Sequence, residues 1–279
     1  MPGDEDKDSH DVKGFLFPSW LMKKVVPLCS WATSNKVWFT LGACCGFKLL
    51  NETFVFGARS WGLEDDWLVH TVAACACGLI HSALACPLSY ESLRRSGWNW
   101  IKQGEQFDVA GPISTLGVTA TLITNSYMIY DFSYVIPYEP DPLILFHHIG
   151  SLLYLVSVLS TGKGGTAALL CILLGEGTNP ATNIYNITKA LTDRGVFTRA
   201  EPRHYLAAVN GITLFLARAI YAPYMLGWKL YEGLFLRKKA AAQVPLALRV
   251  FWISLPSFFI IGTMLYLHNE LPGIRAAFA

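Results

Sequence analysis

The chain has 279 residues, of which 53% are hydrophobic and only 15% charged, and its formal net charge is +2. Because soluble domains carry roughly 25% charged residues, this composition disfavours a soluble enzyme and excludes a disordered chain. Its basic residues are scattered among short segments between apolar runs, so we expect no nucleic-acid partner.

The N-terminal segment, residues 1–36, differs from the rest of the chain. Residues 1–11 are rich in Asp and Glu, and residues 15–31 mix Phe, Trp and Leu with two lysines. We expect residues 1–36 to form a tail that is either flexible in the cytosol or bound along the membrane surface. We expect this tail on the cytosolic side of the membrane, because the tail and the loops on the same side carry most of the Lys and Arg residues.

Apolar runs occupy most of the remaining chain, and crossing a bilayer takes roughly 20 such residues. The first run, residues 37–59, is weak because Lys48, Asn51 and Glu52 interrupt it. Six further runs lie within residues 60–270, and residues 271–279 are left as a short C-terminal tail. Their ranges are 67–87, 109–130, 143–160, 166–187, 205–231 and 246–268. We therefore predict an all-α polytopic membrane protein, a bundle of six to seven transmembrane helices.

Proline residues fall inside two of these predicted helices. Pro180 lies within residues 166–187, and Pro256 within residues 246–268. Because proline removes one backbone hydrogen bond and clashes with the preceding turn, we expect a kink at each position.

Polar side chains inside four successive predicted helices are the most informative feature. A charge at the bilayer centre costs at least roughly 2.5–3.5 kcal/mol on insertion scales, so such groups are usually paired or functional. A bundle must turn its polar faces inward, so we predict a polar pocket between these helices. The residues that we expect around it are Asn125, Tyr130, Asp131, His147, His148, Ser151, Tyr154, Glu176, Asn179, Asn183, Asn210, Thr213 and Arg218.

Structural roles are the alternative for many of these residues. Glu176 and Arg218 can form a buried ion pair that only fixes two helices, and Asn or Thr side chains often join transmembrane helices. The adjacent residues His147 and His148 favour a functional role, because two imidazoles need partners for four ring nitrogens.

A metal site is not predicted. His70, Cys77 and His81 share a face of the helix predicted over residues 67–87, but no carboxylate follows at the spacing of a ligand.

Four short motifs on successive predicted helices together resemble the TLC domain, which TRAM-type translocon-associated proteins and ceramide synthases share. They are residues 125–131, 146–148, 174–183 and 210–218. The sequence is most similar to the stand-alone TLC proteins of lipid homeostasis, in which an acidic residue ends one helix, a His pair opens the next, and a Glu-x-x-x-Pro element follows. The resemblance covers about residues 60–270.

The resemblance implies a multi-pass protein of the endoplasmic reticulum membrane that acts in lipid metabolism or homeostasis. The paired histidines are taken to be catalytic in the ceramide synthase branch, but the His-Asp pair and later Asp of that branch are missing here. The activity that we expect is acyl-CoA-dependent N- or O-acyl transfer to a lipid acceptor other than in ceramide synthesis. A non-catalytic lipid sensor or regulator of membrane composition is one alternative, and a cargo receptor or translocon-associated factor is another.

Acyl transfer assigns a role to each candidate residue. Imidazole, with a pKa of roughly 6.5, would act as base or nucleophile, a carboxylate would orient it, and amides would donate to the oxyanion. The candidate catalytic residues are His147, His148, Asp131 and Glu176. The candidate substrate-binding residues are Tyr154, Asn179, Asn183, Asn210 and Arg218. Membrane lipids are the expected partners, with acyl-CoA as co-substrate, no other cofactor, and a second copy of the chain if the protein forms a homodimer.

Overall fold

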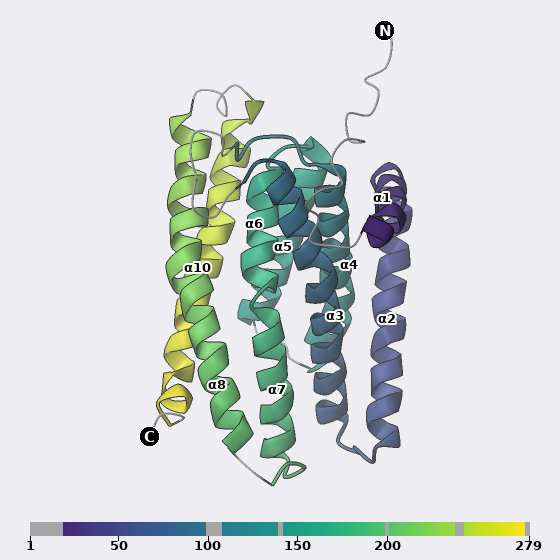
Figure 1. The fold of residues 1–279 in the computed structure, drawn as a ribbon. Helices are drawn as coiled ribbons and strands as arrows, with labels where there is room; N and C mark the ends of the chain where they lie inside the picture. Colours follow the sequence, from purple (N-terminus) through teal and green to yellow (C-terminus); the bar gives the residue numbers. More distant parts are fainter. Residues whose placement is uncertain (1–18, 99–107, 139–141, 199–200, 238–242, 277–279) are drawn as a thin grey trace.

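The computed structural model describes residues 19–98, 108–138, 142–198, 201–237 and 243–276. These residues are almost entirely helical, apart from short loops and an isolated bridge between Pro112 and Lys163. Most of the helices run side by side and form one bundle (Figure 1). The structure thus confirms the predicted all-α fold class.

The bundle follows the chain in order. Its helices are α2 (Lys36–Ser60), α3 (Asp66–Arg95), α4 (Thr115–Tyr138), α5 (Pro142–Thr161), α6 (Gly165–Glu176), α7 (Asn179–Asp193), α8 (Glu201–Leu214) and α10 (Leu246–Ala276). After α8 the same helix continues in π-helical form as η2 (Phe215–Tyr221), η3 (Pro223–Lys229) and η4 (Glu232–Leu236). The core lies around α4, which packs against α2, α3, α5 and α6.

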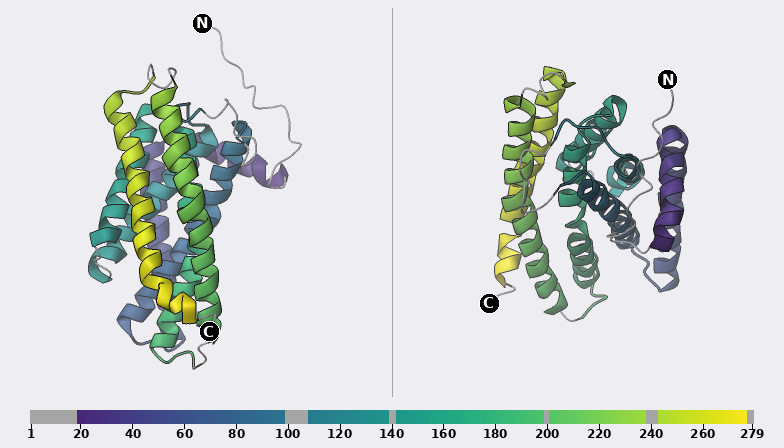
Figure 2. Two further views of the ribbon diagram at one scale, coloured as in Figure 1. Left: turned by 90° about the vertical axis from the view of Figure 1, so that its left-hand side faces the viewer. Right: turned by 45° about the horizontal axis from the view of Figure 1, so that its top comes forward.

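The remaining helix, α1 (Ser19–Ser34), lies across one end of the bundle (Figures 1 and 2). Met22, Cys29 and Ala32 are buried where this helix meets its neighbours α2 and α4. Trp20 and Trp31 are exposed on the helix. Part of the predicted tail is thus an ordered helix, while residues 1–18 lie outside the described part of the chain.

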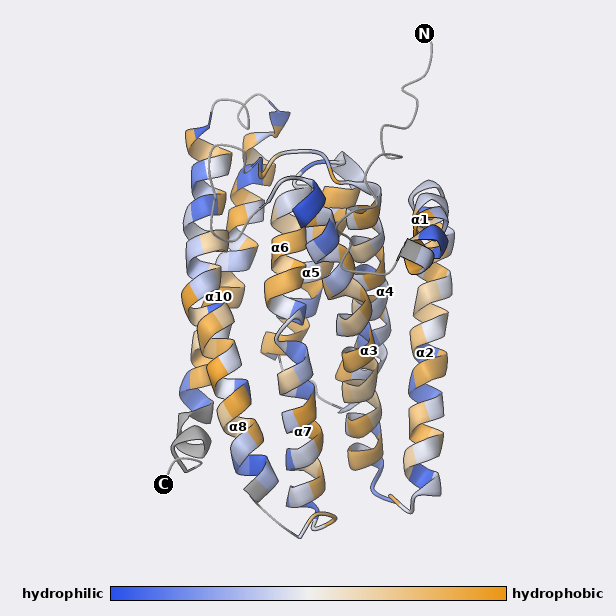
Figure 3. Ribbon diagram, in the orientation of Figure 1, coloured by the Kyte–Doolittle hydropathy of each residue, from blue (hydrophilic) through white to orange (hydrophobic). Residues whose placement is uncertain are grey.

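Four helices in the described part of the chain are long and apolar enough to cross a membrane. They are Asp66–Arg95, Pro142–Thr161, Pro202–Leu236 and Leu246–Asn269. The other predicted spans correspond to α2, α4 and the α6–α7 pair. They run alongside these four helices, but they do not meet the same requirement for length and apolar composition. In α2 the reason is the exposed ion pair between Lys48 and Glu52, and Figure 3 shows polar residues along much of α7. The chain is a multi-pass membrane protein.

The ends of α3 show why a helix forms there. The Asp65 side chain accepts a hydrogen bond from the Leu68 N–H at 2.8 Å, which caps the first turn. At the other end, the buried Glu91 carboxylate accepts hydrogen bonds from Arg94 and Arg95. These two cations also lie in the last turn, where the helix dipole favours positive charge.

One expected helix is broken in two. The prediction of a single helix over residues 166–187, kinked at Pro180, is wrong: α6 ends at Glu176 and α7 begins at Asn179. Proline is tolerated in the first turn of a helix, where no N–H is needed, so Pro180 marks the start of α7. By contrast, α10 continues through Pro256 without interruption.

Gly177, just after the end of α6, lies tightly against the preceding helical turn. A Cβ added at Gly177 would lie only 2.3 Å from the Leu173 carbonyl oxygen, so this position requires glycine. Helix ends inside a membrane must find partners for their free carbonyls. The Gly175 carbonyl accepts hydrogen bonds from the Thr178 hydroxyl at 2.8 Å and from the Arg218 guanidinium at 2.5 Å.

Candidate functional site

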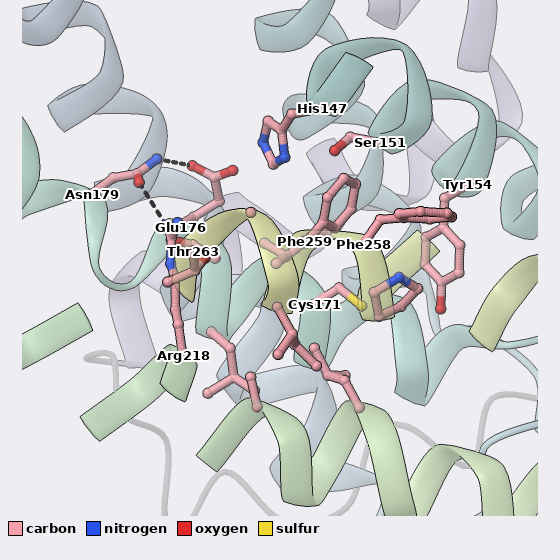
Figure 4. Close-up of a pocket in the computed structure, with 18 of the residues that line it drawn as sticks. His147, Ser151, Tyr154, Cys171, Glu176, Asn179, Arg218, Phe258, Phe259 and Thr263 are labelled. Atoms are coloured by element: carbon pink, nitrogen blue, oxygen red, sulfur yellow. Dashed lines mark hydrogen bonds between the residues drawn. The ribbon is translucent and has the colours of Figure 1, made fainter. Parts of the chain in front are cut away.

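A cavity of about 280 Å³, partly open at the surface of the bundle, lies between α4, α5, α6, α7, the helix that contains η2 and η3, and α10. Apolar side chains, chiefly leucine, isoleucine and phenylalanine, make up most of its wall. Figure 4 shows Glu176, Asn179 and Arg218 on one side of this space and Tyr154 on the other. The cavity is therefore apolar with polar groups at separate places.

Three of the polar side chains bond to one another. The Asn179 amide donates to the Glu176 carboxylate at 2.5 Å, and Arg218 donates to the Asn179 carbonyl oxygen at 3.2 Å. The direct ion pair that the sequence suggested between Glu176 and Arg218 is thus replaced by a link through Asn179. The reason is the helix break, because it places the first residue of α7 between the two charges.

His81 on α3 also contacts Glu176, although no role in the pocket is predicted for it from the sequence. Its Nδ1 atom lies 3.1 Å from a Glu176 carboxylate oxygen, without the alignment of a hydrogen bond. Its Nε2 atom lies 3.2 Å from the Thr124 hydroxyl, and its ring stacks on Tyr127 at 4.2 Å. Because His81 and Glu176 are far apart in the sequence, no local pattern indicates this contact.

The two adjacent histidines lie in different surroundings. His148 is buried against α4, where its Nε2 atom is 2.7 Å from the Asp131 carboxylate. Its Nδ1 atom donates to the Ile144 carbonyl oxygen at 2.9 Å. Both ring nitrogens are therefore occupied, and the Asp131–His148 pair does not line the cavity.

His147 does line the cavity. Its ring meets Phe259 edge-on at 4.6 Å and His148 edge-on at 5.5 Å. Neither ring nitrogen makes a hydrogen bond to a described residue. Ser151 and Tyr154, one and two turns further along α5, also line the cavity, as the helical spacing predicted.

Asn183 and Asn210 lie outside the cavity wall. The Asn183 side chain fills the space beside Gly78 on α3, where an added Cβ would lie 2.5 Å from its amide nitrogen. Asn210 accepts a hydrogen bond from Thr182 at 2.8 Å. Both amides thus join helices to one another, and no observation places them near a ligand.

His70 and His81, which the sequence analysis considered as metal ligands, lie against different aromatic rings. His70 stacks on Tyr138 at 4.3 Å, whereas His81 stacks on Tyr127. Within the described ranges, no group of three or more His, Cys, Asp or Glu side chains is arranged to hold a metal ion.

A comparison with known protein families identifies the family of this chain. The family model of the TLC domain matches residues 67–269, which include every residue that lines the cavity. Neither the curated proteins nor the solved structures gave a match. Because the matched segment spans well over half of the chain, this protein belongs to the TLC-domain family.

Proposed function

We propose that the protein binds a single-chain membrane lipid in the cavity, and that this binding serves lipid metabolism or homeostasis in the membrane of the endoplasmic reticulum. The observation that carries the proposal is the apolar cavity with unpaired polar groups, which lies between helices of a membrane protein. A lipid in the surrounding bilayer is the most abundant ligand with both an apolar chain and a polar group. The organelle follows from the family resemblance.

The size of the cavity limits the ligand. Small-molecule sites usually measure roughly 300–1,000 Å³, and this cavity of about 280 Å³ lies just below that range. One acyl chain suits such a space better than two. We therefore propose a lipid with a single chain, such as a fatty acid or a monoacyl lipid.

The polar groups of the cavity differ in their availability. Glu176, Asn179 and Arg218 bond to one another. His147 and Ser151 line the same cavity without a hydrogen bond from their side chains to a described residue. A ligand that bonds to Glu176, Asn179 or Arg218 must replace an existing hydrogen bond, so its binding free energy improves little. A ligand that bonds to His147 or Ser151 adds a hydrogen bond without breaking one within the protein. We infer that the lipid's polar end lies against His147 and Ser151.

A substitution that fills the cavity tests this proposal. Gly175 lines the cavity, and a Cβ added there would meet no atom within 4 Å, so Gly175→Leu places a side chain in the space that the lipid would use. Gly227→Leu is the matched control, because Gly227 is equally unobstructed but does not line the cavity. The measurement is binding of fluorescent oleic acid to protein in nanodiscs. Equal binding by wild type and Gly175→Leu would refute the proposal.

Acyl transfer is the second candidate function, and the observation that favours it is the unpaired His147 ring. In this reaction the ring takes the proton of an acceptor amine or hydroxyl, and the acceptor forms a bond to the carbonyl carbon of an acyl-CoA thioester. The carbon–sulfur bond then breaks, and the imidazolium returns the proton to the thiolate of coenzyme A. Incubating the nanodisc protein with labelled acyl-CoA and lipid acceptors tests this. Lipid binding without acylated product would leave a lipid-binding protein.

A further inference from the structure

The wall of the cavity contains three side chains that are also exposed on the surface of the bundle. Leu143 and Phe146 on α5 and Phe258 on α10 are about half exposed, whereas the other described residues of the wall are buried or partly buried. A side chain that lines a cavity and is also exposed is either the full thickness of the wall or the edge of an opening. The cavity is therefore open at these three residues, and we call this place between α5 and α10 the lateral opening.

The lateral opening lies between two helices that are long and apolar enough to cross a membrane. These helices are α5 and α10, and Phe258 lies near the middle of its span. Helix α10 runs along the side of the bundle away from α2 (Figure 1). Because the side chains at the edge of the opening carry no polar atoms, they suit a hydrocarbon chain better than water.

An aromatic pair narrows the lateral opening. The Phe146 and Phe258 rings meet edge-on, with their centroids 5.6 Å apart. One turn further along α5 the two helices pack tightly, because a Cβ added at Gly150 would lie 3.0 Å from the Leu255 side chain. The packing is looser near Gly262, where an added Cβ would meet one neighbouring side chain at 3.7 Å. The two helices therefore separate most easily where the aromatic pair lies.

The lateral opening leads directly to the place proposed for the polar end of the lipid. His147 follows Phe146 in the chain, and Phe259 follows Phe258. The His147 and Phe259 rings meet edge-on at 4.6 Å and both line the cavity (Figure 4). A molecule that passes between Phe146 and Phe258 therefore reaches His147 next.

We propose that the lipid enters the cavity from within the bilayer through the lateral opening, and that the Phe146 and Phe258 rings must separate to let it pass. This inference rests on the proposed lipid-binding function and adds the source of the ligand, which is the hydrocarbon layer of the membrane and not the aqueous phase. Lipid tails are as apolar as leucine side chains, so a chain that moves along this route stays in apolar surroundings throughout.

Alanine substitutions on the two sides of the lateral opening test this route. Phe146→Ala and Phe258→Ala each remove the aromatic contact that must break during entry. An edge-on aromatic pair contributes a factor of about two to ten beyond its buried area, so fluorescent oleic acid should associate with each variant in nanodiscs roughly two- to tenfold faster than with wild type. Stopped-flow fluorescence measures this rate. Association is the decisive step, because the loss of an ordinary contact with bound lipid chiefly speeds dissociation.

Phe215→Ala is the matched control. Phe215 is 53% exposed and Phe258 is 52% exposed, and Phe215 belongs to η2, which packs against α10. Phe215 does not line the cavity, so oleic acid should associate with this variant at the wild-type rate. Faster association with Phe215→Ala as well would show that the effect is not specific to the lateral opening, and would overturn the inference.

The outcomes separate the inference from the function on which it rests. If either folded variant of the aromatic pair associates with oleic acid at the wild-type rate, the inference is overturned while lipid binding stands. Thermal unfolding in detergent shows whether each variant is folded, and if one is not, the other decides. If wild type binds no oleic acid, the proposed lipid-binding function fails together with the inference.

Discussion

His147 and His148 are adjacent in the sequence, but α5 turns their side chains to different neighbours. His147 lines the cavity with unpaired nitrogens, and His148 is held between Asp131 and the Ile144 carbonyl. Successive residues on a helix point about 100° apart, so one residue can serve a ligand while the next fixes two helices together. The pair therefore combines a candidate chemical group with a structural one.

Replacing each histidine with asparagine should separate these roles. His148→Asn removes the partner of the buried Asp131 carboxylate, and breaking such a pair costs roughly 3–5 kcal/mol of unfolding free energy. His147→Asn breaks no hydrogen bond to a described residue, so its thermal stability in detergent should stay close to wild type. If the protein transfers acyl groups, His147→Asn should lower turnover by about 10²–10⁴-fold. Equal stability of the two variants would contradict this assignment.

Glu176 is the residue at which several helices meet, since it contacts His81 on α3 and Asn179 on α7. The hydrogen bonds of Arg218 link it to Glu176 through Asn179. We expect a double-mutant cycle of Glu176→Gln with His81→Gln to give a coupling energy within about 0.5–3 kcal/mol, the usual range for contacting residues. The cycle of Glu176→Gln with Arg218→Gln should give a smaller value. Unfolding free energies in detergent supply both cycles, and a larger coupling to Arg218 would contradict the observed geometry.

At the scale of helices, the break between α6 and α7 shapes the site. It allows Glu176 to end one helix and Asn179 to begin the next, so that both side chains reach the cavity. In a continuous helix the Gly175 carbonyl would accept a hydrogen bond from a backbone N–H one turn later. Here it accepts hydrogen bonds from the Thr178 hydroxyl and the Arg218 guanidinium instead. Discontinuous helices of this kind commonly contribute to binding sites within membranes.

Alanine substitutions at two nearby glycines test the break. Gly177→Ala forces a Cβ to within 2.3 Å of the Leu173 carbonyl oxygen, so the backbone must shift, and we expect a loss of at least about 1 kcal/mol of unfolding free energy. Gly175→Ala introduces a Cβ into open space within α6, where alanine is favoured over glycine by roughly 0.5–1 kcal/mol. Thermal unfolding of both variants gives the comparison. A Gly177→Ala protein as stable as Gly175→Ala would show that the break tolerates a side chain.

The whole molecule places its two described chain ends at opposite ends of the bundle. Helix α1, where the described chain begins, and the start of α2 lie at one end, and the last turns of α10 lie at the other (Figure 1). The end of α3 and the connection from α5 to α6 also lie at this end (Figure 1), and they carry Arg94, Arg95 and Lys163. Because positive charges are enriched in cytosolic loops, we propose that this end faces the cytosol.

This orientation predicts the accessibility of terminal tags. In sealed microsomes, protease added outside should remove a tag at the N-terminus and leave a tag at the C-terminus intact. The same digestion after detergent treatment is the control, because both tags should then be cleaved. Two tags with equal accessibility in sealed vesicles would mean an even number of crossings between them, in conflict with the arrangement of the bundle.

The sequence by itself determined the helical class, the family and one face of the site. Long apolar runs can cross a membrane only as helices, because every backbone N–H and C=O must then be paired within the segment. The stripe of His147, Ser151 and Tyr154 follows from the period of 3.6 residues alone. These properties depend on neighbours within a few turns, which a sequence displays directly.

Only the tertiary structure decided which polar residues share the cavity. His81 reaches Glu176 from a distant helix, and His148 and Asn183 turn away from the cavity toward other helices. The rotation of each helix about its axis and the end of α6 at Glu176 fix these partners. Both depend on packing between residues far apart in the chain, since one polar residue gains its hydrogen bond equally well from several neighbours, and packing selects among them.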